Sequence, residues 1–327
     1  MNRTLLFISL FSIFILVSCQ SSPKNEAGKQ NEVELVAEKQ LAFPLDEQTY
    51  YLSKSMFQFE ENGKEYLHFE NTQKSLYDIV IFDIENQQIA KRIPLHKTGP
   101  NGLPAVYGSR PSPDSKQILI SQNNIGRLST INNQGEVVHN YPVKTPEGRF
   151  TTFFFCSYYN APAFVKDSCI FLNQGIFKPN MKREDWPQTH MFASQNLKTG
   201  KFEWVPIFYP PIFKEEYENI DGGYGFSYDY NYKENRLVCG FFGYDSLMVT
   251  DDLKHIRWYN AKSKYLKSMK PKLGNAMAGI NSIIEFCEAP MYWHIMYDKY
   301  RDVYYRFAEM PYKLASNESP YDEPKGK

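Results

Sequence analysis

Several side chains could carry chemistry, but their spacing matches no catalytic signature. The six histidines stand at positions 68, 96, 139, 190, 255 and 294, and none of their spacings is typical of a metal site. H-E-x-x-H, G-x-S-x-G and Walker A motifs do not occur. Lys-Thr-Gly occurs at Lys97 and again at Lys198, but without a convincing S-x-x-K motif both copies predict turns rather than an acyl-transfer site.

Metal and cofactor sites are equally unsupported. The stretch Asp229-Tyr230-Asn231-Tyr232-Lys233 alternates oxygen-bearing side chains, yet it lacks the glycine and the distant glutamate of a calcium loop. No C-x-x-C pair occurs, so neither a zinc knuckle nor a thioredoxin-like motif is indicated. We therefore expect no metal and no cofactor.

Two polar, aromatic stretches are candidates for ligand contact. Arg183, Asp185 and Trp186 lie in a long loop, and Tyr224 and Tyr228 belong to the tyrosine-rich segment YGFSYDYNY. Tyrosine and tryptophan suit sugar or peptide ligands because each offers a flat apolar ring with a polar group. The alternative is that these aromatic rings pack between structural units.

The N-terminus predicts export and lipid attachment. Arg3 precedes an uncharged apolar run from Leu5 to Val17, which is typical of a signal peptide and shorter than the roughly 20 residues of a spanning helix. Leu16-Val17-Ser18-Cys19 resembles a bacterial lipobox, in which the cysteine is acylated, for example with palmitate, and begins the mature chain. An ordinary signal peptide or a buried core segment are the alternatives.

The residues after Cys19 read as a tether. Residues 20–31 (QSSPKNEAGKQN) contain no large apolar side chain and cannot offset the entropy of ordering. The predicted organisation is a signal peptide (1–18), a lipidated tether (19–32) and a folded body (33–327). In the lipoprotein sorting rules that the lipobox implies, Gln20 in place of aspartate favours the outer membrane.

Composition limits the class of partner. Lys plus Arg and Asp plus Glu both number 37, so a nucleic-acid partner has little electrostatic support and is not expected. The 24 tyrosines and 24 phenylalanines favour strands over helices. Lys262 to Lys270 is the best helix candidate, short and basic.

The remaining cysteines would lie in an oxidising compartment, where disulfides can form. Cys156 and Cys169 flank the turn-like segment Asn160 to Ala163, and a symmetric hairpin there would place them opposite one another. A disulfide between them is one prediction, and the alternative is that both are small buried apolar residues.

A unit of strands and polar turns recurs along the body every 50 to 60 residues or so. Ile79 to Phe82 is a continuous apolar run, as expected of a buried strand, and polar Asp/Asn/Gly turns follow at corresponding places. The segment PSPDSKQILIS resembles the start of a blade in WD40 and TolB-like propellers. We therefore predict an all-β fold, a β-propeller of four-stranded antiparallel blades, incomplete at the C-terminus; a pair of β-sandwiches is the alternative.

The lipobox, the turn Gly99-Pro100-Asn101-Gly102 and the segment YDKYRDVYYRF (Tyr297 to Phe307) resemble the DUF4221 family. This resemblance implies a lipoprotein of Bacteroidetes, related to six-bladed propeller lipoproteins, and carries over no catalytic residue. Family members continue beyond the YYRF strand with another hairpin, whereas this sequence continues with the polar segment SNESPYDEPKGK. Either a strand around Glu34 to Leu41 closes the ring, or the propeller is a shorter version.

The leading functional hypothesis is a lipid-anchored binding or scaffold protein of the cell envelope. Its partners would be the membrane, through the lipid on Cys19, and a carbohydrate, a peptide or an envelope protein. The alternative is a propeller hydrolase or lyase for a polysaccharide or peptide, with acidic and histidine residues converging only in the fold.

Overall fold

The computed structural model describes residues 36, 40–49, 56–71, 77–112, 114–122, 126–143, 161–173, 187–210, 226–266 and 290–310. Two compact units are distinguished, Met1–Ala42 and Phe43–Lys327, and all named strands belong to the second. The described ranges hold no α-helix, and hence none with the length and apolar character to span a bilayer. The part of the helix candidate that is described, residues 262–266, is irregular, so the helix prediction is wrong there.

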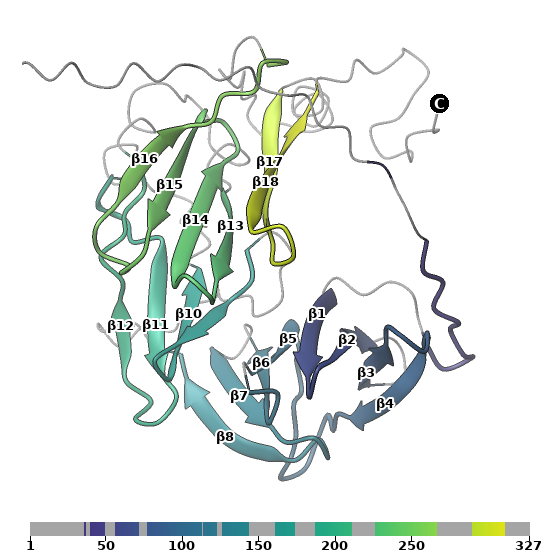
Figure 1. The fold of residues 1–327 in the computed structure, drawn as a ribbon. Helices are drawn as coiled ribbons and strands as arrows, with labels where there is room; N and C mark the ends of the chain where they lie inside the picture. Colours follow the sequence, from purple (N-terminus) through teal and green to yellow (C-terminus); the bar gives the residue numbers. More distant parts are fainter. Residues whose placement is uncertain are drawn as a thin grey trace, which may run out of the picture. The chain divides into compact units, whose positions relative to one another are not determined.

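Four antiparallel four-stranded sheets follow one another along the chain as propeller blades, and a two-stranded sheet comes after them in the described residues (Figure 1). The first blade contains β1 (Met56–Glu61), β2 (Lys64–Asn71), β3 (Asp78–Asp83) and β4 (Gln88–Pro94). The second contains β5 (Gly108–Pro111), β6 (Ile118–Gln122), β7 (Arg127–Ile131) and β8 (Val137–Pro142). The third contains β9 (Phe164–Lys166), β10 (Cys169–Asn173), β11 (Phe192–Asn196) and β12 (Phe202–Trp204). The fourth contains β13 (Phe226–Asn231), β14 (Arg236–Phe241), β15 (Ser246–Thr250) and β16 (Arg257–Asn260), and β17 (Met291–Asp298) pairs with β18 (Val303–Glu309).

Within each blade the strands are paired in chain order, so each blade is a simple meander. The inner strands β1, β5 and β13 face the other blades, whereas β4, β8, β12 and β16 lie on the outside (Figure 1). The burial pattern agrees, because β13 is almost fully buried and all four residues of β16 are exposed. The apolar run Ile79–Phe82 is buried throughout in β3, as its sequence predicts.

Neighbouring blades share hydrophobic cores. Ile79 of β3 and Ile120 of β6 belong to one cluster, and Leu119 of β6 packs with Ile170 of β10 in the next. The largest cluster joins the third and fourth blades through aromatic side chains such as Phe192, whose ring lies 5.0 Å from that of Tyr228. Some of the many aromatic side chains of the sequence therefore pack between blades, where large side chains fill the space between the sheets.

The polar turn that recurs in the sequence lies between the third and fourth strand of each blade. In every case an Asp or Asn oxygen accepts a backbone N–H two or three residues later, at 2.8–2.9 Å. This side-chain bond pre-forms the turn and explains why Asp and Asn recur at that point of each unit. The four turn residues are Asp83, Asn132, Asn196 and Asp252. The second Lys-Thr-Gly segment, at Lys198, is part of one of these turns, as predicted.

The hairpin around Cys169 differs from the expected one. The turn falls at Asp167 and Ser168, both with positive φ, and Cys169 pairs across the ladders with Lys166 and Asn196. A symmetric hairpin centred on Asn160 to Ala163 is therefore not formed by β10. Cys156 lies outside the described residues, so its disulfide with Cys169 stays a prediction.

The turn Gly99-Pro100-Asn101-Gly102 lies in the linker between β4 and β5 and bonds this linker to β8 of the second blade. Gly99 adopts φ +86°, and the N–H of Gly102 donates to its carbonyl at 2.9 Å. The Asn101 side-chain oxygen accepts the N–H of Val137 at the start of β8, at 3.0 Å. This motif, which supports the family resemblance, therefore has a structural role.

Replacing Asn101 with alanine is expected to lower the free energy of unfolding by about 1 kcal/mol, because the half-buried N–H of Val137 loses its acceptor. Urea denaturation measures the change. Asn260→Ala is the control, since the Asn260 oxygen accepts only the local and exposed N–H of Lys262. Equal losses in the two variants would contradict a specific role for Asn101.

The two-stranded sheet is attached to the fourth blade by a half-buried arginine. Arg306 of β18 donates to the backbone carbonyls of Asp245 at 2.7 Å, Phe241 and Ala261 at 3.2 Å, and Tyr244. Its guanidinium lies 3.3 Å from the ring centre of Tyr292. Burial lowers the pKa of Arg306 to about 10, so the guanidinium remains charged at neutral pH.

The β17–β18 turn also contacts the first blade. Lys299 Nζ lies 2.7 Å from a Glu65 carboxylate oxygen and 3.5 Å from Glu60, and the Tyr300 hydroxyl donates to Glu65. Gln58 of β1 donates to the Tyr300 hydroxyl at 3.2 Å. The last described sheet is therefore linked to the first by polar contacts. Of the stretch proposed to close the ring, Glu34 to Leu41, only Val36, Gln40 and Leu41 are described, and they form no strand.

Candidate functional site

The inner strands of different blades bring a small group of polar and aromatic residues together, which we call the axial cluster. It consists of Phe57 (β1), Arg110 (β5), Val165 (β9), Asp229 (β13) and Tyr232, the residue after β13. Each of the four blades contributes at least one member. Ligand sites of propellers are assembled in this way, from inner strands and loops that lie far apart in the sequence.

Arg110 is the centre of the axial cluster. Its Nη2 donates to the Tyr232 hydroxyl at 3.3 Å, and its guanidinium carbon lies 5.3 Å from the ring centre of Phe57. Its Nη1 is buried and has no hydrogen-bond partner among the described residues. An unsatisfied buried N–H costs about 1–3 kcal/mol, and more on a charged group. Arg110 therefore holds donor capacity that the described fold does not use.

Tyr232 connects two blades to Arg110. Its hydroxyl oxygen accepts the backbone N–H of Val165 at 3.2 Å in addition to the bond from Arg110. Both bonds use lone pairs, so within the described chain the hydroxyl proton has no acceptor. The Tyr232 side chain is 44% exposed, which makes this proton the accessible donor of the cluster.

Asp229 supplies the negative charge near Arg110, but its oxygens are already used. One accepts the N–H of Tyr230 at 2.8 Å and the other accepts the N–H of Tyr297 in β17 at 2.9 Å. Desolvation raises the pKa of Asp229, although these two bonds and the charge of Arg110 oppose the rise. No described carboxylate lies within 4.0 Å of the Arg110 guanidinium, Asp229 included.

His68 lies behind the axial cluster, in β2. It is completely buried, and its Nε2 lies 2.7 Å from the Ser109 hydroxyl oxygen. Desolvation, with a smaller contribution from Arg110, lowers its pKa to about 3. His68 is therefore neutral at physiological pH. Its ring contacts the Ser109 hydroxyl and so helps to hold β5, the strand that carries Arg110.

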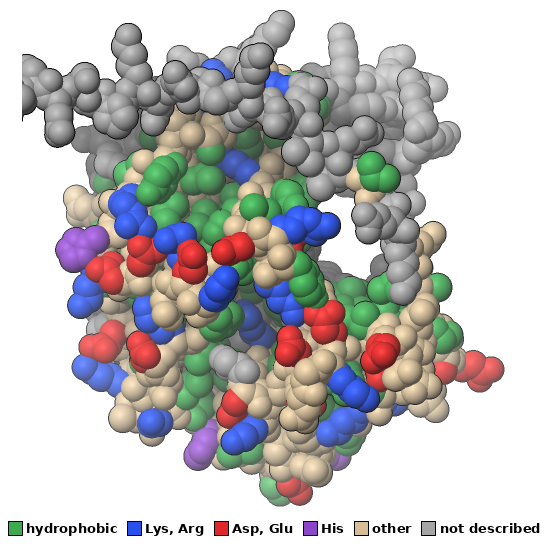
Figure 2. Space-filling view, in the orientation of Figure 1, with side chains coloured by type: hydrophobic (Ala, Val, Ile, Leu, Met, Phe, Trp, Pro, Cys, Tyr) green, Lys and Arg blue, Asp and Glu red, His purple; other side chains and the backbone are tan. Residues whose placement is uncertain are grey.

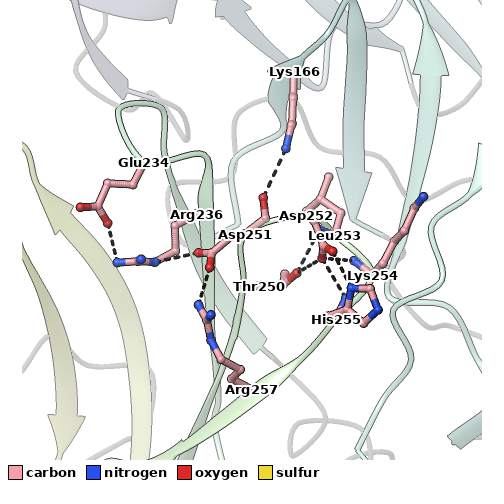
Figure 3. Close-up of polar contacts among 10 residues, drawn as sticks. All are labelled: Lys166, Glu234, Arg236, Thr250, Asp251, Asp252, Leu253, Lys254, His255 and Arg257. Atoms are coloured by element: carbon pink, nitrogen blue, oxygen red, sulfur yellow. Dashed lines mark hydrogen bonds and ion pairs between the residues drawn. The ribbon is translucent and has the colours of Figure 1, made fainter.

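Asp251 and Asp252 form the densest group of charges in the described residues, and their geometry is structural (Figure 3). Asp251 pairs with Arg236 and Arg257, and its carbonyl accepts Lys166 Nζ at 3.4 Å. Asp252 accepts the backbone N–H groups of Lys254 and His255, and these bonds hold its pKa below its usual range. The oxygens of both carboxylates are thus engaged, those of Asp251 by arginines of β14 and β16 and those of Asp252 by residues at the turn that follows β15.

The predicted ligand-contact residues fall mostly outside the described chain. This holds for Arg183, Asp185, Trp186 and Tyr224, and also for the lipobox residues Leu16, Val17 and Ser18 and for Cys19. Tyr228 is described, and the structure corrects its assignment. It lies in β13 with no exposed surface, and its hydroxyl donates to the carbonyl of Ala161 at 3.0 Å, so it belongs to the core between blades.

The segment from Asp229 to Lys233 is a strand end and turn rather than a metal loop. The Asn231 oxygen accepts the N–H groups of Lys233 and Glu234 and so closes the turn. Across the described ranges, no three His, Cys, Asp or Glu side chains are grouped so as to hold a metal ion. On the face in Figure 2, Lys and Arg side chains are interleaved with Asp and Glu, as the balanced composition predicts.

The four meander blades and their shared cores define a β-propeller, in agreement with the prediction and against the sandwich alternative. The chain belongs to the DUF4221 family, whose model, described as a domain of unknown function, matches residues 32–325. It is similar to a crystal structure of a DUF4221 member from Bacteroides vulgatus, with 84% identity over 91% of this chain and 82% of that one and a TM-score of 0.84. A putative exported protein from Bacteroides fragilis shares the fold at 10% identity, over 82% of this chain and 74% of that one, with a TM-score of 0.51. No curated protein matches the chain.

Proposed function

We propose that this DUF4221 propeller is a binding or scaffold protein of the cell envelope, anchored to the outer membrane by a lipid on Cys19. The axial cluster is the observation that supports the binding role. Its residues come from four blades, and they include a charged donor with unused capacity, an exposed hydroxyl and two aromatic rings. The lipobox at Leu16 to Cys19 and the polar tether beyond it support the anchor. Two or more acyl chains would make the attachment stable, because each buried methylene contributes about 0.8 kcal/mol.

A binding role predicts affinity without turnover. Full-length protein in mild detergent, presented to an array of polysaccharide fragments and envelope peptides, is expected to retain a subset of them. Mass spectrometry of the released fragments is expected to show unchanged masses. Shortened fragments or unsaturated sugar ends would instead establish the hydrolase or lyase alternative.

Replacing Cys19 with alanine is expected to abolish acylation and to move the folded protein out of the detergent-extracted membrane fraction. The cysteine thiol is the only attachment point that the lipobox offers, so no partial anchoring is expected. Metabolic labelling with a palmitate analogue, followed by separation of inner and outer membranes, measures both effects. Ser18→Ala is the matched control and should keep the label, because a small residue at that position preserves the cleavage site. Labelling of the alanine variant at Cys19 would refute the anchor.

A further inference from the structure

We propose that Arg110 and Tyr232 form a binding site for the carboxylate of an acidic sugar. This inference rests on the proposed binding function and specifies its ligand class. It starts from a comparison of the hydrogen-bond acceptors that the arginines of the described chain contact. Arg92, Arg236, Arg257 and Arg301 each pair with a carboxylate, Arg127 donates to an amide oxygen, and Arg306 donates to backbone carbonyls.

Arg110 has one described acceptor, the phenol oxygen of Tyr232, at 3.3 Å. A buried Nε without a partner also occurs on Arg127 and on Arg306, but those two arginines donate to amide or carbonyl oxygens, which are stronger acceptors than a phenol. A phenol oxygen is a weak acceptor that carries no charge, and the bond is long for N–H···O. Nη1 has no acceptor at all in the described residues. A full positive charge is therefore left beside half-buried aromatic rings without a counter-ion in contact.

The donors are arranged for an anion. A guanidinium edge presents two parallel N–H groups, which match the two oxygens of a carboxylate, and such charge-assisted pairs are about twice as strong as neutral bonds. The Tyr232 hydroxyl proton adds a third donor, since both of its described bonds occupy lone pairs. Asp229 does not take this place in the described structure, because no ion pair joins it to Arg110 and its two oxygens are directed to the backbone N–H groups of Tyr230 and Tyr297.

Tyr232 occupies Nη2, the terminal nitrogen of Arg110 beside Nη1. In the present structure Nη1 is shielded from solvent, whereas Tyr232 is 44% exposed and is held by two hydrogen bonds longer than 3.1 Å. A rotation of this side chain releases Nη2, and a carboxylate then replaces the phenol oxygen on the guanidinium. In the proposed complex the hydroxyl, released from both of its present bonds, donates its proton to the ligand.

The aromatic surroundings favour a sugar as the carrier of the carboxylate. The Phe57 ring lies under the guanidinium, and the Tyr232 ring meets that of Tyr230 at 5.0 Å, nearly perpendicular. Aromatic faces beside a polar group suit the apolar faces of pyranose rings, and tyrosine hydroxyls suit their hydroxyl groups. The ligand class that fits these features is an oligosaccharide containing a uronic acid.

Calorimetric titration of the full-length protein in mild detergent with tetragalacturonate tests the proposal. The fully methyl-esterified tetrasaccharide is the matched ligand control, because it keeps the sugar and removes the charge. We expect the acid to bind and the ester to bind at least tenfold more weakly, since a charge-assisted bond contributes about 1.5–3 kcal/mol. Arg110→Gln is expected to weaken binding of the acid by about 100-fold, and Tyr232→Phe by about tenfold.

Two further variants separate binding from folding. Lys233→Gln removes a neighbouring charge on an exposed side chain and should leave the affinity within about threefold of the original, as expected for a solvated charge. Arg110→Lys keeps the charge, loses the bidentate edge and should retain partial affinity with an unchanged melting temperature. Wild-type affinity in the Arg110→Gln protein, or equal binding of acid and ester, would overturn the proposal.

Two further outcomes also test the proposal. A peptide with a free C-terminal carboxylate, acetyl-Gly-Gly, is titrated in parallel, and if it binds through Arg110 while the tetragalacturonate does not, the acidic-sugar assignment is wrong. If neither carboxylate binds, the carboxylate site is refuted. In that case neutral fragments retained on the array would still support a binding function, so the two proposals fail separately.

Discussion

Replacing Gly135 with alanine is expected to lower the free energy of unfolding by about 3 kcal/mol. Gly135 lies between β7 and β8 with φ +82°, a conformation that costs a side-chain-bearing residue about 1–2 kcal/mol. A Cβ atom there would lie 2.0 Å from the carbonyl oxygen of Pro94, at the end of β4 in the neighbouring blade. Backbone atoms cannot yield as a flexible side chain would, so the first two blades must move apart.

Gly63→Ala is the matched control for this prediction. Gly63 has a similar φ of +74°, but no heavy atom lies within 4 Å of the position of its Cβ. Its substitution should therefore cost about 1 kcal/mol, from backbone conformation alone. Guanidinium denaturation of both variants isolates the contact between blades as the difference. Losses of the same size would show that the blades do not meet closely at Gly135.

Local signals made the blades predictable from the sequence. In each blade a turn residue accepts a hydrogen bond from a backbone N–H two or three positions later, so a few consecutive residues are enough to specify the turn. These residues are Asp83, Asn132, Asn196 and Asp252. The segment PSPDSK behaves likewise, because Asp114 accepts the Ser112 hydroxyl at 2.6 Å and closes the turn before β6. Recurrence of such turns at a regular interval sets the length of a blade and hence the fold class.

The axial cluster could not be found in the same way. Arg110 contacts Phe57 and Tyr232, which come from two other blades, and Tyr232 in turn accepts the N–H of Val165 from a third. Nothing in the residues around Arg110 distinguishes it from a solvated arginine. Arg110 is unusual because its buried Nη1 has no hydrogen-bond acceptor among the described residues, and this can be seen only in the folded structure. The single available signal was the alternation of polar side chains from Asp229 to Lys233, which marks a strand entering a turn.

Tyr228 illustrates the opposite error. The segment YGFSYDYNY is dense in tyrosine and contains glycine, which favours a loop with accessible rings. Residues Phe226–Asn231 of this segment instead form β13, which is almost fully buried, and Tyr228 and Tyr230 on one of its faces are both buried. In a propeller the inner strands are covered on both sides by adjacent blades, and aromatic content alone cannot separate a pocket wall from this packing.

Acidification is expected to destabilise the protein through His68, by up to about 5 kcal/mol between pH 6.5 and pH 3. Burial lowers the pKa of His68 from 6.5 to about 3, so below pH 6.5 the unfolded chain binds a proton that the folded chain refuses. The stabilising contribution is complete above pH 6.5 and is lost as the pH falls toward 3, with a slope of about 1.4 kcal/mol per pH unit. None of the described groups that face His68 would stabilise its protonated form. Its cross-strand partners are the apolar Phe57 and Ile81. Ser109 is neutral, and the positive charge of Arg110 disfavours a second positive charge nearby.

His68→Gln removes the titrating group while its amide can still bond to the Ser109 hydroxyl. Urea denaturation at pH 7.0, 5.5 and 4.5 should show that the variant is less stable at neutral pH and loses less stability on acidification than the wild type. Carboxylates whose pKa is lowered by their partners, such as Asp46 with Thr49 and Asp298 with Arg301, are present in both proteins, so any contribution they make cancels in the comparison. His139→Gln is the control for the loss of a histidine, because His139 is an exposed residue of β8. If wild type and His68→Gln lose stability in parallel, His68 is protonated in the folded state, and water must reach the strand that carries Arg110.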